Sequence, residues 1–156
     1  MRYIHLITPR LRIELEQSPE VNNEHIWWHL IVHNDSIKAI DDCYAQLLSF
    51  TPNLNKRLYQ AVHLPWSSFG GQDMETATIP GKSFRYFDVV MTNKKDLYVL
   101  TFAPNPSLRG TPFPEPPGQY ELVIQVGSNR QSFMPSKIKL EAIFSKDGNL
   151  DVKEVK

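Results

Sequence analysis

Residues 25–33 read HIWWHLIVH, and the alternation of their side chains decides the fold class. Apolar side chains at the even positions share one side of an extended chain: Ile26, Trp28, Leu30 and Val32. Tryptophan, isoleucine and valine are enriched in strands, and a period of two residues is typical of a half-buried strand. We therefore expect a β-strand whose even-numbered side chains enter the core.

The odd side of this stretch carries His25, His29 and His33, together with Trp27 and Ile31. On a helix such histidines would stack as metal ligands. On a strand the rise of ~3.3 Å per residue separates neighbouring histidines by roughly 13 Å, whereas zinc binds nitrogens at about 2 Å. The pattern therefore predicts no three-histidine metal site. It leaves open whether a sheet edge, the proline-rich segment or a partner protein covers this side.

The same alternation recurs along the chain in segments that are bounded by turn formers. The segments are RLRIELE (10–16), DDCYAQLLSF (41–50), SFRYFDVVM (83–91), DLYVLTF (96–102), QYELVIQV (119–126) and KIKLEAIF (137–144). About eight short strands of this kind predict an all-β fold, an antiparallel two-sheet β-sandwich.

The chain of 156 residues fits a single domain over residues 1–156, with its core at about 10–145. The turn Asp147-Gly148-Asn149 predicts a C-terminal hairpin over residues 138–155. Residues 53–62 carry apolar side chains at helical spacing and predict one short helix.

Composition narrows the classes of partner. The 17 basic and 17 acidic side chains cancel, which argues against a nucleic-acid binder. No apolar run approaches the ~18 residues of a membrane span, and the N-terminus shows no signal peptide, so we expect no membrane insertion by this segment. With Cys43 as its single cysteine, the chain forms no internal disulfide, which slightly favours the cytoplasm.

Cys43 alternates with Ala45 and Leu47 and follows two aspartates. A nucleophilic cysteine needs a nearby base and an electropositive setting, so we expect a buried structural residue. Calcium takes six to eight oxygen ligands, and no calcium-binding loop motif is present. Weak calcium candidates remain among the loop aspartates Asp35, Asp41, Asp42 and Asp73. We expect no cofactor.

Flat exposed aromatic rings bind sugars in many β-sandwich modules. Trp27 lies opposite the apolar side of its strand, and Trp66 lies in a polar segment with Tyr59 nearby in sequence. These three residues are the candidate carbohydrate platform. The alternative is that Trp27 packs beneath the proline-rich segment or a neighbouring domain.

Catalytic signatures such as G-x-S-x-G, the P-loop or H-E-x-x-H are absent, so we expect no enzyme. An enzyme would have to place its site in the two long connections, residues 64–76 and 104–118. The second connection carries six prolines and predicts an extended surface loop or edge.

The segment PGQYELVIQV, residues 117–126, resembles the G-x-Y-x-L-x-V-x-V strand of immunoglobulin-like and fibronectin type III-like domains. In those families the tyrosine hydroxyl bonds back to nearby backbone, which implies a structural role for Tyr120. The strands around Trp28 and Cys43 are similar to those of bacterial immunoglobulin-like accessory modules, which implies structural roles there too. The chain lacks the paired cysteines of antibody domains.

The resemblance covers roughly residues 10–145 and implies a fold without an activity. The leading hypothesis is a non-catalytic interaction or structural accessory module within a larger bacterial protein. Such a module binds a protein partner or a neighbouring domain. A ligand-binding sandwich is the first alternative, and an enzyme is the second.

Overall fold

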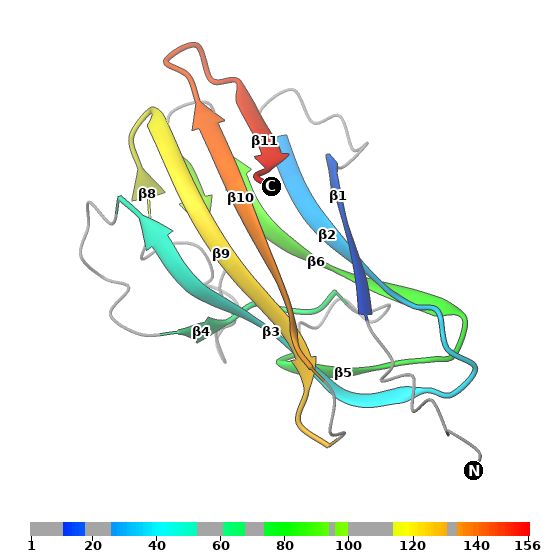
Figure 1. Ribbon diagram of the computed structural model, residues 1–156. Helices are drawn as coiled ribbons and strands as arrows, with labels where there is room; N and C mark the ends of the chain where they lie inside the picture. Colours follow the sequence, from blue (N-terminus) through cyan, green and yellow to red (C-terminus); the bar gives the residue numbers. More distant parts are fainter. Residues whose placement is uncertain are drawn as a thin grey trace.

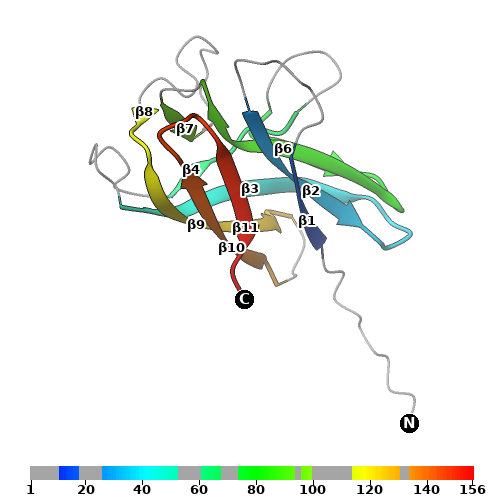
Figure 2. The same cartoon turned by 90° about the horizontal axis from the view of Figure 1, so that it is seen from above.

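The computed structural model describes residues 11–17, 26–52, 61–67, 74–93, 96–99, 114–130 and 134–156. These residues form two antiparallel sheets that pack against each other (Figures 1 and 2). The described ranges contain strands and no helix. The predicted all-β, two-sheet antiparallel sandwich is therefore confirmed.

One sheet has five strands in the order β1-β2-β6-β7-β8. Their bounds are β1 Leu11–Gln17, β2 Ile26–Asn34, β6 Ser83–Thr92, β7 Leu97–Val99 and β8 Pro114–Glu115.

The other sheet runs β11-β10-β9-β3-β4, and β5 pairs with the N-terminal half of β3. Their bounds are β3 Ile40–Thr51, β4 Val62–His63, β5 Thr76–Ile79, β9 Gly118–Ser128, β10 Ser136–Phe144 and β11 Leu150–Glu154. β10 and β11 form the predicted C-terminal hairpin. The predicted helix falls mostly outside the described residues, and its last residue, Val62, begins β4.

β2 covers the opening stretch from Ile26 onward and lies between β1 and β6. Leu30 and Val32 are fully buried, and Ile26 and Trp28 are half-buried against the core. The Trp28 indole N–H donates to the carbonyl of Leu150 on the other sheet, at 3.2 Å. The even-numbered side of the stretch therefore faces the core, as the alternation predicts.

Asn34, at the end of β2, joins the turns at one end of the sandwich. Its side chain is 1% exposed, and its amide nitrogen donates to the carbonyls of Lys38 at 2.8 Å, Ile79 at 3.0 Å and Pro80 at 3.2 Å. Its Oδ1 accepts hydrogen bonds from the backbone N–H and the hydroxyl of Ser36. Because buried carbonyls need partners, this one side chain stabilises both the β2–β3 and the β5–β6 connections.

Tyr120, near the start of β9, makes the contact that its resemblance implies. Its hydroxyl donates to the carbonyl of Pro116 at 2.5 Å, and its ring stacks on Phe50 with centroids 5.1 Å apart. Burial first, and then the charge of Glu115, raise the pKa of Tyr120 to about 12. Tyr120 is therefore a structural residue that fixes the entry into β9.

Tyr120→Phe tests that hydrogen bond. We expect the variant to lose about 1 kcal/mol of unfolding free energy, as for a typical intramolecular hydrogen bond, measured by urea denaturation. Tyrosine titrates near pH ~10 in an unfolded chain, so its raised folded pKa stabilises the wild type below that pH. This stability is lost as the pH rises towards 12, and the phenylalanine variant should not show that loss. Identical alkaline unfolding of both proteins would contradict the assignment.

Candidate functional site

The outer face of strands β1, β2 and β6 carries the odd-numbered side of the opening stretch. The register places Ile31 between Glu14 of β1 and Tyr86 of β6, and it places His33 between Arg12 and Phe84. Cross-strand neighbours of this kind lie about 4.5–5.5 Å apart at Cβ and form continuous rows. The histidines therefore lie among acidic and aromatic neighbours rather than beside one another.

Each described histidine of β2 contacts a glutamate of β1. His33 Nε2 lies 3.0 Å from a carboxylate oxygen of Glu14, and His29 Nε2 lies 3.4 Å from one of Glu16. The His29 ring also lies 5.3 Å from that of Tyr86, centroid to centroid. These contacts hold the two imidazoles in separate pairs with glutamates. His25, the third histidine of the pattern, lies outside the described residues, so the absence of a three-histidine site stays a prediction.

Two aromatic side chains of β6 dominate the exposed surface beside these pairs. Phe84 is 54% exposed and Tyr86 is 44% exposed, which is high for rings within a regular strand. Phe84 also lies 5.8 Å from the ring of His33. We call the surface formed by Glu14, Glu16, His29, Ile31, His33, Phe84 and Tyr86 the aromatic face.

The charge of the aromatic face is acidic. Arg12, at its border, is already paired, since its guanidinium donates to both carboxylate oxygens of Asp35 at 3.0 and 3.2 Å. The hydrogen bond from Arg12 lowers the pKa of Asp35 below its usual value. The aromatic face itself carries two carboxylates, Glu14 and Glu16, and neither lysine nor arginine, so its permanent charges are negative.

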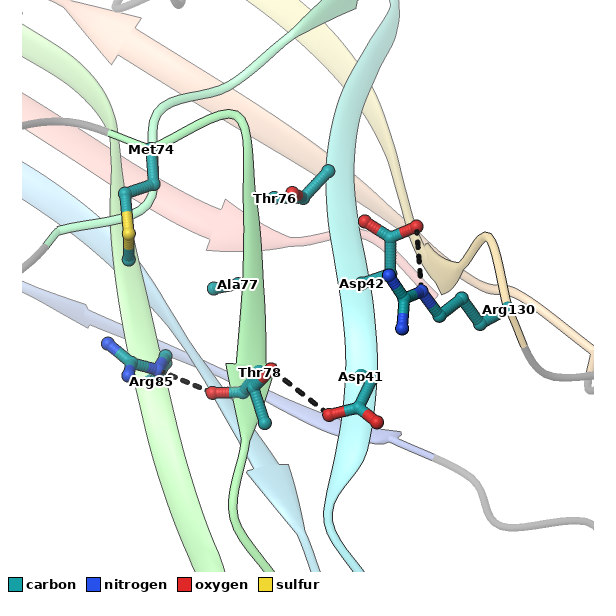
Figure 3. Close-up of a pocket in the computed structure, with 8 residues that line it drawn as sticks. All are labelled: Asp41, Asp42, Met74, Thr76, Ala77, Thr78, Arg85 and Arg130. Atoms are coloured by element: carbon teal, nitrogen blue, oxygen red, sulfur yellow. Dashed lines mark hydrogen bonds and ion pairs between the residues drawn. The ribbon is translucent and has the colours of Figure 1, made fainter.

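An open hollow of about 510 Å³ lies across β5, between β3 and β6 (Figure 3). A bulge in β3 sets two residues, Asp41 and Asp42, opposite Thr78, and Asp42 has a φ of 54°. Asp41 accepts from the Thr78 hydroxyl at 3.1 Å, and Arg85 Nε donates to the Thr78 carbonyl at 2.7 Å. Arg130 Nε lies 3.8 Å from Asp42. Two carboxylates and two guanidinium groups make the hollow electrically balanced, so it does not favour a cation.

Two of the weak calcium candidates, Asp41 and Asp42, line this hollow together, and each has a partner of its own. Asp35 pairs with Arg12, Asp41 with Thr78, and Asp42 with Arg130, while Asp73 lies outside the described residues. No three acidic, histidine or cysteine side chains of the described ranges group as metal ligands.

The carbohydrate platform loses one of its members. Trp66 was expected to be exposed, and this expectation is wrong, because its side chain is 0% exposed. Its backbone N–H and C=O pair with Met74, at 2.8 and 3.1 Å, and its ring packs edge-on against Phe87. Trp27 is half-buried on the outer side of β2, and Tyr59 lies outside the described residues.

Cys43 lies inside the core and is fully buried. Its thiol donates to the carbonyl of Ile40 at 3.3 Å, and burial raises its pKa to about 12. A thiol is a poor nucleophile when it is protonated and buried, so Cys43 has the environment of a structural residue.

The connections proposed for an enzyme site are described only in part. Residues 68–73 and 100–113 lie outside the described ranges. Within the first connection, Leu64 and Trp66 are buried core residues. The described part of this connection therefore contributes packing to the sandwich.

Sequence reasoning missed Phe84, Tyr86 and the two glutamates of the aromatic face. In the sequence Phe84 and Tyr86 form part of a strand pattern, and their neighbours on the exposed side depend on the register with β2. Glu14 and Glu16 alternate with Leu15, which signals an exposed strand side without showing its neighbours.

No helix among the described residues is long and apolar enough to cross a membrane. Comparisons with family models, with curated proteins and with solved structures find no match for this chain.

Proposed function

We propose that this chain is a non-catalytic interaction module of immunoglobulin-like type that serves a larger protein, and that a protein partner with basic side chains binds its aromatic face. The observation that carries the proposal is the pair of exposed rings, Phe84 and Tyr86, beside Glu14 and Glu16. Large exposed apolar patches on a soluble domain mark interaction sites.

The strand order supports the immunoglobulin-like assignment. Such domains place strands A, B and E in one sheet and C, F and G in the other. Here β1-β2-β6 and β3-β9-β10 have these positions, and Tyr120 lies near the start of the strand equivalent to F. The chain departs from the pattern in β7 and β8, which follow β6 in sequence and extend its sheet, and in β11, which follows β10.

The chemistry of the aromatic face fits a basic protein surface. Tyrosine and phenylalanine rings provide contact area at a low cost in side-chain entropy, and they attract guanidinium and ammonium groups over their faces. Glu14 and Glu16 supply the complementary charge, which steers association and fixes orientation. Catalysis has no support in the described side chains, because Cys43 is buried and protonated and the histidines are engaged by glutamates.

The test is a selection of binders from a random peptide library, followed by mapping of the bound peptides on the protein by amide chemical shifts. We expect peptides rich in lysine and arginine that perturb Ile31 and Tyr86. The double substitution of Phe84 and Tyr86 by alanine should weaken their binding about 10-fold or more. Ile143→Ala, at a 40% exposed apolar position of the other sheet, is the matched control and should leave binding unchanged. Peptides that map to the other sheet would refute the proposal.

A further inference from the structure

β1 is the end strand of the five-stranded sheet. It pairs with β2 along its whole length, and no described strand pairs with its other side (Figure 1). An end strand presents unpaired N–H and C=O groups, which can accept an added strand. In antiparallel pairs the hydrogen-bonded positions alternate along each strand, and this alternation identifies the residues of β1 that carry the unpaired groups.

In an antiparallel pair, residues alternate between those that bond across the pair and those that point away from it. The N–H of Ser67 donates to the carbonyl of Tyr86 at 3.0 Å, so the backbone of Tyr86 points away from β2. The backbone N–H and C=O of its register partner Ile31 therefore point in the opposite direction, towards β1. Ile31 is opposite Glu14, and these two residues exchange the backbone hydrogen bonds.

It follows that Ile13 and Leu15, the neighbours of Glu14, direct their backbone groups away from β2. Leu11 has the same parity and gives an independent check. Its carbonyl accepts the hydroxyl of Ser136 at 3.2 Å, a contact from outside the β1–β2 ladder. No hydrogen bond within the described ranges engages the outward N–H and C=O groups of Ile13 and Leu15.

The side chains along β1 indicate which residue types an added strand would need. The inward-pointing side chains of β1 are Leu11, Ile13 and Leu15. Ile13 and Leu15 are only half-buried, so they leave apolar surface that an added strand can contact. Glu14 and Glu16 point outwards beside the open edge. A strand laid along this edge would place alternate residues next to the leucine and isoleucine side chains and the others next to the glutamates.

We propose that β1 accepts an extended segment of the protein partner as an added strand, with apolar residues alternating with lysine or arginine that face Glu14 and Glu16. This inference rests on the proposed function and specifies how the partner binds. Backbone hydrogen bonds provide affinity in such strand addition, and the alternate side chains provide specificity. Two acidic side chains beside the edge disfavour acidic segments, because like charges directly opposite each other are destabilising.

The probe is a nine-residue peptide of alternating valine and lysine. We expect its binding to slow hydrogen exchange at the amides of Ile13 and Leu15, measured by NMR, by about 10-fold or more. The amide of Glu14 should change little, because it is already bonded to Ile31. Two control peptides are matched to the probe. One carries N-methyl groups at alternate positions on its hydrogen-bonding edge, and the other carries glutamate in place of lysine, and neither should protect these amides.

Ile13→Pro tests the edge from the protein side. Proline removes the outward N–H and reduces the half-buried side chain at this position, but it breaks no hydrogen bond between β1 and β2, so an edge strand tolerates it. The variant should keep its circular dichroism spectrum and lose peptide binding about 10-fold or more. If it does not fold, the N-methylated peptide decides the same question on the wild-type protein.

The outcomes separate the two proposals. If the peptide binds, needs Phe84 and Tyr86, and is indifferent to N-methylation and to Ile13→Pro, the aromatic face binds partners without strand addition and this inference is overturned. If sedimentation shows a dimer of the free protein with Ile13 and Leu15 protected, a second copy occupies the edge, which also overturns it. Protection of both amides by the valine–lysine peptide alone supports it.

Discussion

Asn34→Asp is expected to destabilise the domain by about 3–5 kcal/mol at neutral pH, the range for an uncompensated charge in a buried position. The substitution keeps the shape of the side chain but replaces a donor with a carboxylate. Its oxygen would then face three carbonyls, those of Lys38, Ile79 and Pro80, in a 1% exposed site. Unfolding by urea, followed by circular dichroism, measures the loss.

The defect should depend on pH in a defined direction. Burial, together with three carbonyls that face one of its oxygens, raises the pKa of the introduced carboxyl group above its unfolded value of about 3.9, while Ser36 still donates to the other oxygen. The loss relative to wild type should therefore be smallest below that pH, where the introduced carboxyl group is protonated in both the folded and the unfolded state, and should grow as the pH rises. Asn129→Asp makes the same change at an exposed position and should have little effect. A similar, pH-independent loss in both variants would contradict the role of Asn34.

The longer described strands, together with β7 and β11, were predicted from local pattern, because their side chains alternate with a period of two residues, whereas the short strands β4, β5 and β8 were not predicted. In β9 and β10 the buried positions, such as Leu122, Ile124, Ile138 and Leu140, alternate as the sequence does. The hairpin to β11 follows from the Asp147-Gly148-Asn149 turn for the same local reason. Features that are set within a few residues of one another are therefore readable from sequence.

The aromatic face and the Asn34 cluster depend on partners distant in sequence. In the sequence Asn34 is followed by Asp35 and Ser36, a composition typical of a local turn, but its amide reaches Ile79, 45 positions away. The spacing of the histidines predicts no shared metal site, but only the register with β1 shows that His29 and His33 meet Glu16 and Glu14. A strand pattern specifies which side chains share a face and leaves their cross-strand neighbours undefined.

Trp66 shows the opposite error, in which polar neighbours concealed a core residue. The serines and glycines that follow it in sequence suggested an exposed loop. Its position is set instead by backbone pairing with Met74, and by the bond from Ser67 to Tyr86, which hold the ring against Phe87. Local composition cannot report such pairings.

Trp66→Ala should consequently cost about 3–5 kcal/mol of unfolding free energy, the range for removing a large buried aromatic ring. The total stability of a domain is typically about 5–15 kcal/mol. If the wild type lies near the lower end of this range, the loss would leave a large fraction of the variant unfolded at ~37 °C. Urea unfolding monitored by circular dichroism is the appropriate measurement, since the substitution removes a fluorophore.

Trp66→Phe separates packing from hydrogen bonding at the same position. The buried indole nitrogen has no hydrogen-bond partner among the described residues, so phenylalanine loses volume without breaking a bond. Its cost should be clearly smaller than that of alanine, because most of the contact with Phe87 is kept.

Equal losses in the two variants would mean that the nitrogen has a partner of its own. A loss below about 1 kcal/mol for alanine would place the ring outside the core and restore Trp66 as a ligand platform. We expect the alanine variant to be much less stable than the phenylalanine variant. That result would make Trp66 a structural support of β6, the strand that carries the exposed rings of the aromatic face.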